Sequence, residues 1–341
     1  MTAMEEIAKA IHDIIKGYRN EDGIYILLQD ILDWAAQFGD DAEFMLSELL
    51  HLLRQVYYSK TNAINGLRNL LNRQYKDYGF VSVEEYLQKT CFLRLQPEGK
   101  SQHLYFEMMD EIVHKTTGHH ISEYDNYPKT LYVYMDDILA SGGTIRKDLM
   151  AWLDADNHAE LLKSRKINLE LSLICVHTLG LSFMLYGLQK KYGNLPIKYR
   201  SCYEIQNHLK WLDQALNIAI PVKDQPKEVK EYLAQLDAEK YEEYAYRDSV
   251  KPATEMFFTS PENRVKFENI LLGKGLYIIN QIKGEIKPNI RPLGMISPNF
   301  KTFGLGTHFF TWRNVPNNCP LVYWWDVPGH NWKPLFPPKR G

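Results

Sequence analysis

Hydrophobic residues recur every three or four positions over the first 88 residues, which is the spacing of helices that are buried on one side. The clearest positions are Ile7, Ile11, Ile14 and Ile15, followed by Ile24, Leu27, Leu28, Ile31 and Trp34. Gly39 is suited to a helix end, and Asp40 or Asp41 to the next helix start. Residues 1–88 are therefore predicted to form a helical domain, which is compatible with a winged-helix module.

The pattern changes after residue 88, where strand-like runs alternate with helical segments. Four of these runs are expected to be strands: Cys91–Leu95, Thr130–Met135, Leu169–His177 and Ile197–Tyr203. Strands that alternate with helices along the chain are typical of a parallel sheet. The predicted fold class is therefore α/β, with a parallel-sheet core.

Two later segments have a different composition. Residues 206–284 are rich in Lys, Glu, Gln and Tyr at helical spacing, which predicts a helical insertion. Residues 285–341 carry four of the seven tryptophans, and strands are expected at Leu305–Arg313 and Pro320–Trp325. These aromatic residues either pack the tail against the core or form a hood that recognises a base. The predicted core domain thus joins residues 89–205 to residues 285–341.

The strongest candidate site follows the second predicted strand. Leu131–Met135 is an apolar run, and Asp136 and Asp137 come where such a strand would end, at the sheet edge where ligands bind. Ser141–Thr144 then forms a tight glycine-rich loop before a predicted helix at Ile145–Leu153. Backbone N–H groups at a helix start bind anions, and carboxylates accept hydrogen bonds from a sugar diol or hold a hydrated Mg²⁺. The segment therefore predicts a phosphate and ribose site, with Asp136 and Asp137 as candidate metal ligands.

The segment YVYMDDILASGGT resembles the 5-phosphoribosyl-1-pyrophosphate (PRPP) signature of the type I phosphoribosyltransferases, most closely the adenine enzymes. The resemblance implies that Asp136 and Asp137 contact the ribose 2′ and 3′ hydroxyls. It also implies that the 5′-phosphate is held by Ala140, Ser141, Gly142, Gly143 and Thr144. In the 6-oxopurine enzymes an acid stands at the position of Ala140, so a hypoxanthine-guanine type of mechanism is not expected.

A second loop follows the first predicted strand. Glu98, Gly99, Lys100 and Ser101 precede a helical pattern, and a lysine with a flexible glycine at a helix start suits pyrophosphate. The segment is not a P-loop, because it lacks the earlier glycine of that motif. A turn of this kind that merely caps a helix is the alternative. Type I phosphoribosyltransferases place their pyrophosphate loop one strand before the ribose loop, so the resemblance assigns that role to Glu98–Ser101.

Composition narrows the class of protein. A net charge of −2, with 24% charged and 45% hydrophobic residues, indicates a soluble globular protein without a general affinity for polyanions. Cys91, Cys175, Cys202 and Cys319 are far apart in the sequence, so we expect free thiols in a reducing compartment. No apolar run reaches membrane-spanning length and no signal peptide is apparent, so we expect a cytoplasmic protein that does not bind membranes.

One stretch is locally basic, because no acid occurs between Glu48 and Asp77. Its candidate nucleic-acid contacts are Arg54, Lys60, Arg68, Arg73 and Lys76. Clustered cations gain affinity for nucleic acid when counterions are released, and neighbouring tyrosines can stack on bases. An ordinary solvated basic face is the alternative.

Histidines give weaker signals. The adjacent His119 and His120 lie in a polar loop with no partner at metal-ligand spacing, which indicates surface residues. His308 and Arg313 are catalytic candidates only if the tail closes the site.

A wider resemblance covers most of the chain. It rests on QFGDDAEFMLSELLHLL, LQPEGKSQ, YMDDILASGGT and TWRNVPNNCPLVYWW, which resemble bacterial phosphoribosyltransferase-like proteins of anti-phage defence that accompany retrons as effectors. This resemblance implies a toxic effector that is held inactive by a complex of reverse transcriptase with its DNA–RNA product.

Two functions are compatible with these observations. The first is an enzyme that displaces pyrophosphate at the ribose C1 of PRPP or a related nucleotide, with Asp136, Asp137 and Lys100 as the catalytic residues and Mg²⁺ as cofactor. The second is a regulatory protein that senses such a nucleotide and binds nucleic acid without catalysis.

Overall fold

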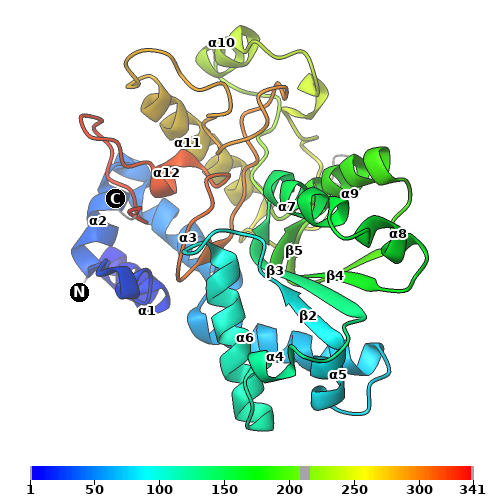
Figure 1. Ribbon diagram of the computed structural model, residues 1–341. Coiled ribbons are helices and arrows are strands. Elements are labelled where there is room, and N and C mark those ends of the chain that lie inside the picture. The colour runs from blue at the N-terminus through cyan, green and yellow to red at the C-terminus, as the bar shows by residue number, and fades with distance from the viewer. Residues whose placement is uncertain (1, 208–215, 339–341) are drawn as a thin grey trace. The chain divides into compact units, whose positions relative to one another are not determined.

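The computed structural model describes residues 2–207 and 216–338. The chain falls into two compact units. The sheet unit is Thr61–Ile205, and the discontinuous unit joins Met1–Lys60 to Gln206–Gly341. Figure 1 shows the elements of both, and each is described by itself below.

The sheet unit contains a four-stranded sheet in which every strand runs parallel to its neighbours. The strand order is β2-β3-β4-β5, with β2 at Thr90–Leu93, β3 at Leu131–Leu139, β4 at Asn168–His177 and β5 at Ile197–Ile205. The four expected strands are thus confirmed, and so is the α/β class with a parallel core. Nine of the ten residues of β4 are buried, as expected of a strand that is covered on both faces.

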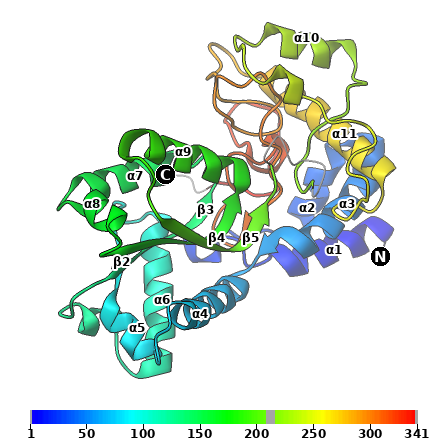
Figure 2. The same cartoon turned by 90° about the vertical axis from the view of Figure 1, so that its right-hand side faces the viewer.

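Helices cover both faces of this sheet (Figure 2). One face carries α4 at Lys60–Asp77, α5 at Val83–Lys89 and α6 at Ser101–Thr117, and a 3₁₀ turn follows at Ile121–Tyr124. The other face carries α7 at Gly143–Asp154, α8 at His158–Lys163 and α9 at Thr178–Tyr192. The core on the α7 side joins alternate residues of β4, including Leu171 and Leu173, to Leu149 and Met184 of the helices.

A buried polar contact attaches α4 to the sheet. Glu170 of β4 is fully buried, and its Oε1 accepts hydrogen bonds from Gln74 Nε2 and Arg200 Nε, both at 2.8 Å. Arg200 Nη1 also donates to Asp77 Oδ2 at 2.6 Å. The first domain therefore does not end at residue 88 as predicted, because α4 and α5 pack against the sheet and belong to the sheet unit.

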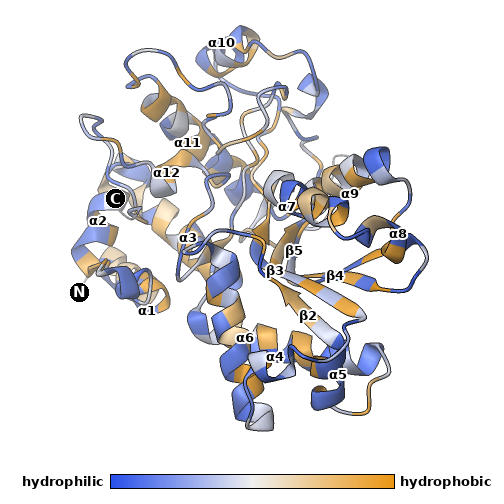
Figure 3. Ribbon diagram, viewed as in Figure 1, coloured by the Kyte–Doolittle hydropathy of each residue, from blue (hydrophilic) through white to orange (hydrophobic). Residues whose placement is uncertain are grey.

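The discontinuous unit is built from both ends of the chain. Its first part contains α1 at Ala3–Ile15, α2 at Leu28–Ala36, α3 at Ala42–Val56 and β1 at Tyr57–Tyr58, with 3₁₀ turns at Asn20–Asp22 and Gly39–Asp41. Its second part contains α10 at Lys227–Gln235, a 3₁₀ turn at Glu242–Tyr244, α11 at Pro261–Ile279, β6 at Phe310–Thr311 and α12 at Leu321–Trp324. β1 and β6 pair in parallel. The helices α1, α2 and α3 carry hydrophobic residues on one side and hydrophilic residues on the other (Figure 3).

The aromatic tail packs inside the discontinuous unit. Trp34 of α2 and Trp332 of the tail both donate to the backbone oxygen of Val322, at 2.9 and 3.1 Å. The rings of Phe310 and Phe336 stack with centroids 5.0 Å apart. These aromatic residues therefore pack the tail into the protein, as one of the two interpretations predicted, and they do so against the N-terminal helices. This grouping differs from the predicted one, which joined residues 285–341 to the sheet.

The two strands expected in the tail were largely wrong. Leu305–Arg313 contributes only the two residues of β6, and Pro320–Trp325 contains the short helix α12. A run of aromatic residues fits a strand or a buried helix turn equally well, and here Pro320 at the N-cap position starts a helix.

The predicted helical insertion at residues 206–284 is helical in α10 and α11 and irregular between them, and part of it, residues 208–215, lies outside the described residues.

Buried ion pairs hold α11 in place. Glu268 is fully buried and accepts from Arg247 Nη2 at 2.8 Å and from Arg264 Nη1 at 3.3 Å. Burial raises the pKa of Glu268, and the two guanidinium groups oppose that shift.

Within the described ranges, no helix is both long and apolar enough to cross a membrane.

Candidate functional site

The acid pair lies inside β3, whereas the sequence placed it just after the strand. β2 ends at Leu93, opposite Tyr134, while β3 continues to pair with β4 as far as Leu139. The long partner β4 keeps the backbone of β3 extended past both acids. From Met135 onward, β3 therefore has a strand neighbour on one side only, and the acids lie next to the loop that follows β2.

A cavity of about 470 Å³ opens at this place. It is lined by Asp136, Asp137 and the whole of Ala140–Thr144, together with Lys100 and Ser101 of the second loop. Glu98 and Gly99 do not line it. The structure thus brings together most of the residues that the two loops suggested, all within the sheet unit. α6 and α7 both begin at this cavity, so two helix N-termini supply N–H groups and positive dipole ends there.

Two glycines shape the phosphate loop. Gly142 has φ +72°, and a side chain there would meet Gly180 O at 2.6 Å. A Cβ on Gly180, in the first turn of α9, would stand 1.8 Å from Ala140 O. The loop backbone therefore rests directly on α9, and neither position has room for a methyl group. The role of Gly142 was expected from the motif, while Gly180 was missed.

Asp136 is held by donors from the protein. It is 5% exposed, and Ser101 Oγ donates to its Oδ1 at 2.6 Å while Gln96 Nε2 donates to its Oδ2 at 2.8 Å. The backbone N–H of Asp137 also donates to Oδ1, at 2.9 Å. Asp137 itself is half-buried, and its Oδ1 accepts from Ile138 N at 2.8 Å.

Tyr134 and Asp148 extend this hydrogen-bonded group. Gln96 Nε2 donates to the Tyr134 hydroxyl at 2.8 Å, and that hydroxyl donates to Asp148 Oδ2 at 2.8 Å. Burial, and then the negative charge of Asp136, hold the pKa of Tyr134 well above its usual range, so the hydroxyl stays a donor.

Sequence analysis also did not identify four polar or charged residues of the site: Gln96, Tyr134, Lys147 and Asp148. Tyr134 was assigned only to the apolar run, although its position two residues before Asp136 puts it on the same face of the strand. Lys147 and Asp148 follow Gly143 by four and five residues, about one helical turn into α7, and that spacing was the available signal.

The two carboxylates of this site suit a metal ion that is bound together with a phosphate ligand, rather than one held by protein side chains alone. No group of three or more His, Cys, Asp or Glu side chains gathers as metal ligands in the described parts of the chain. Both oxygens of Asp136 already accept hydrogen bonds. Mg²⁺ is commonly bound by one or two carboxylates together with substrate phosphates. Asp137, with the second acid beside it, matches that kind of site.

The histidine predictions had mixed outcomes. His119 and His120 are exposed and contact Glu123 and Asp110, as expected for surface residues. His308 is fully buried among aromatic rings of the discontinuous unit, and this burial lowers its pKa to about 3. A neutral, enclosed imidazole does not suit the catalytic role considered for it. Arg313 lies two residues after β6 in the same unit.

All five basic candidates are exposed, but they belong to different units. Arg54 lies on α3. Lys60 is the first residue of α4 and the last residue of the first part of the discontinuous unit, and it pairs with Glu21. The other three lie on one polar face of α4 that also carries four exposed asparagines: Asn62, Asn65, Arg68, Asn69, Asn72, Arg73 and Lys76. The asparagines were missed from the sequence, and they add hydrogen-bonding amides to the cations.

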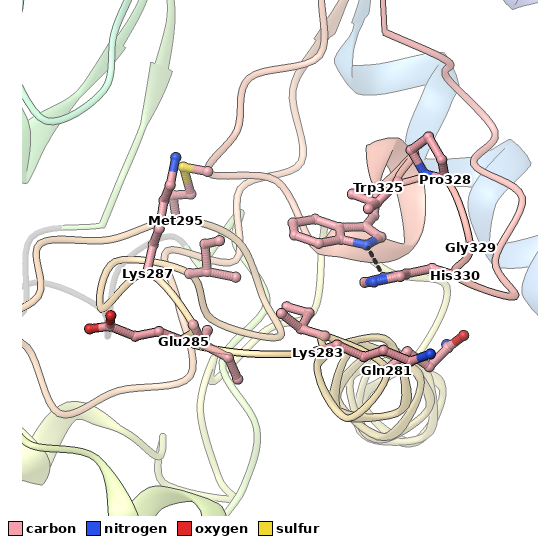
Figure 4. A pocket seen from close by; sticks show the side chains of 13 residues that line it. Gln281, Lys283, Glu285, Lys287, Met295, Trp325, Pro328, Gly329 and His330 are labelled. Atoms are coloured by element: carbon pink, nitrogen blue, oxygen red, sulfur yellow. Dashed lines mark hydrogen bonds between the residues drawn. The ribbon is translucent and has the colours of Figure 1, made fainter.

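A second cavity, of about 540 Å³, lies in the discontinuous unit (Figure 4). Its wall is mostly apolar, and Trp325 Nε1 donates to His330 Nδ1 at 3.0 Å beside it. None of the predicted site residues lines this cavity. All four cysteines lie among the described residues and none forms a disulfide, as expected.

Comparison with known proteins identifies a family for the chain. The searches of curated proteins and of solved structures found no match. The family model PRTase-CE matches residues 31–337, about nine-tenths of the chain, and supports a phosphoribosyltransferase-like fold. The chain therefore belongs to the PRTase-CE family, with a phosphoribosyltransferase-like α/β fold.

Proposed function

We propose that the protein binds PRPP or a closely related nucleotide in the cavity of the sheet unit and catalyses displacement of pyrophosphate at the ribose C1. The observation that carries this proposal is the gathering of the acid pair, the glycine-rich loop and Lys100 around one cavity at two helix N-termini. Family membership supports a phosphoribosyltransferase-like function in general. The choice of PRPP rests on the resemblance of the YVYMDDILASGGT segment.

Each part of the cavity has a role in this reaction. The backbone N–H groups of Ala140–Thr144, at the start of α7, bind the 5′-phosphate, and the ribose diol binds at the acid pair. The bond between C1 and the pyrophosphate oxygen breaks as positive charge grows on the ring, and a nucleophile adds to C1. Lys100 and Lys147 line the cavity as cations that stabilise the departing pyrophosphate. Mg²⁺, when bound, neutralises pyrophosphate oxygens.

Titration with PRPP and Mg²⁺ tests this function. Calorimetry is expected to show saturable binding, and a coupled assay is expected to show pyrophosphate release once an acceptor is present. Candidate acceptors are water, free bases, nucleic acid and protein side chains, each added separately. Binding without release in every mixture would favour the alternative of a nucleotide-sensing regulator, and absence of binding would contradict both.

We further propose that the protein is a toxic effector of an anti-phage system of the retron type and acts in the cytoplasm. The support is the resemblance of four segments along the chain to such effectors. The expected inhibitory partner is a reverse transcriptase with its DNA–RNA product. This polar face of α4 supports contact with nucleic acid, because three cations and four amides lie on it together.

Neutralising two cations on α4 is expected to weaken binding to nucleic acid. With Arg68→Gln and Arg73→Gln, the affinity for a DNA–RNA hybrid should fall severalfold at low salt, and the slope of log affinity against log salt should become shallower by about one to two units. Fluorescence anisotropy at several salt concentrations measures both. The matched control is Lys163→Gln with Lys190→Gln, which removes two charges elsewhere on the sheet unit. Equal effects of the two pairs, or no effect of the first, would contradict the assignment.

A further inference from the structure

The two carboxylates of the acid pair have different surroundings. Asp136 is buried, and both of its oxygens accept hydrogen bonds from side chains of the protein. Asp137 is half-buried, and its Oδ1 accepts from the next backbone N–H along the chain. The family resemblance treats the pair as equivalent, but the first acid already has protein partners for both oxygens.

The side-chain donors that hold Asp136 both come from the loop after β2. Gln96 lies at the start of this loop and Ser101 at its end, where α6 begins. Between these anchors, Pro97–Lys100 are all exposed. A single buried carboxylate thus ties both ends of an exposed loop to β3, and the loop carries Lys100 into the cavity.

Gln96 is itself held in one orientation. Its Nε2 donates to Asp136 and also to the hydroxyl of Tyr134. The one proton of that hydroxyl is used at 2.8 Å toward Asp148, whereas its oxygen is 3.5 Å from Asp136 Oδ2. Tyr134 must therefore accept from Gln96, which fixes the amide with its NH₂ group toward both acceptors. The chain of bonds runs from Gln96 through Tyr134 to Asp148, and its members polarise one another.

Gln102 of α6 holds the start of the same loop. Its Oε1 accepts from Leu95 N at 2.6 Å and from Gln96 N at 3.0 Å, and its Nε2 donates to Met135 O at 3.3 Å. Gln102 is fully buried. The loop is therefore attached to β3 beside the acid pair by side chains of α6 as well as by Asp136.

We infer that the two acids have separate roles: Asp136 is a positioning residue that fastens the loop Gln96–Ser101 to β3, and Asp137 is the carboxylate that meets the ribose diol. The second role rests on the proposed function. The first depends only on contacts within the protein, so the two roles can be tested independently.

Hydrogen exchange of the unliganded protein tests the fastening. Asp136→Asn removes a charged acceptor from the loop anchors, so amides of residues 95–104 are expected to exchange about tenfold faster or more. Ser101→Ala should act in the same direction, and Ser101→Thr, which keeps the hydroxyl, should restore slow exchange. Asp137→Asn should leave exchange in this segment unchanged. Ser182→Ala, at an exposed helix serine that bonds only to its own helix, is the control.

Calorimetry with PRPP and Mg²⁺ tests the ligand role on the same variants. Asp137→Asn is expected to weaken binding while the loop stays protected, whereas Asp136→Asn and Ser101→Ala weaken binding and loosen the loop together. Unchanged loop exchange in Asp136→Asn, or equal loosening in Asp137→Asn, would overturn the separation of roles. A wild-type protein that does not bind PRPP would refute the proposed ligand, while the exchange data would still decide the fastening role.

Discussion

Replacing Asp136 and Asp137 together by asparagine is expected to weaken PRPP binding at least about a hundredfold and to abolish both pyrophosphate release and toxicity. Hydrogen bonds to charged groups contribute about 1.5–3 kcal/mol each. Two such bonds to the ribose diol therefore amount to roughly 3–6 kcal/mol, and every 1.4 kcal/mol is a factor of about ten in affinity. Calorimetry measures the affinity, and growth of expressing cells measures the toxicity.

The control for this double variant must also lose two negative charges, but at positions away from the cavity. Glu111→Gln with Glu160→Gln fits, because both side chains are exposed and lie on helices of the sheet unit. Circular dichroism should show that both doubles remain folded. If cells that express the double asparagine variant grow as poorly as cells with the wild type, the enzymatic account of toxicity is refuted.

A single methyl group at Gly180 is expected to damage the site without touching any ligand. The new Cβ would stand 1.8 Å from the backbone oxygen of Ala140 and 2.8 Å from its carbonyl carbon, so the phosphate loop must move. Overpacking of this kind costs about 1–3 kcal/mol, which outweighs the gain of up to about 1 kcal/mol from replacing glycine by alanine in a helix. Thermal unfolding should show a lower midpoint, and PRPP affinity should fall about tenfold or more.

Two other helical glycines provide the comparison. Gly187→Ala, on the same helix, meets the flexible side chain of Arg146, which can move aside. Gly273→Ala on α11 meets nothing within 4 Å and should be neutral or stabilising by up to about 1 kcal/mol. If Gly180→Ala behaves like Gly273→Ala, the close contact between α9 and the phosphate loop does not exist in solution.

The sheet and most of the site could be predicted because local signals coincide there. The strands β3 and β4 contain long apolar runs, and the Asp136–Thr144 segment combines two acids with two glycines in a fixed order. These features act over a few residues, so they can be read from the sequence. The end of β3 was misplaced because it depends on how far β4 continues to pair, which is not a local property.

Residues that act through tertiary contacts could not be found in this way. Gly180 is an ordinary helix glycine until Ala140 is placed on it, and Gln96 has no motif that marks it as a partner of Asp136. The aromatic tail shows the same limit, because its composition indicates burial but not the helices that bury it. Long-range partners of this kind are decided by packing, which local patterns do not encode.

The pairing of β1 with β6 has a consequence for the order in which the chain folds during synthesis. Tyr57 and Phe310 are about 250 residues apart, and the whole sheet unit lies between them in the sequence. Domains generally fold as they leave the ribosome, and non-local contacts form late. Residues 61–205, which contain the cavity, can therefore become structured before Phe310 and Phe336 have been synthesised and can pack in the discontinuous unit. The cavity formed by residues of this segment can then exist before the discontinuous unit is complete, because the second part of that unit is synthesised last.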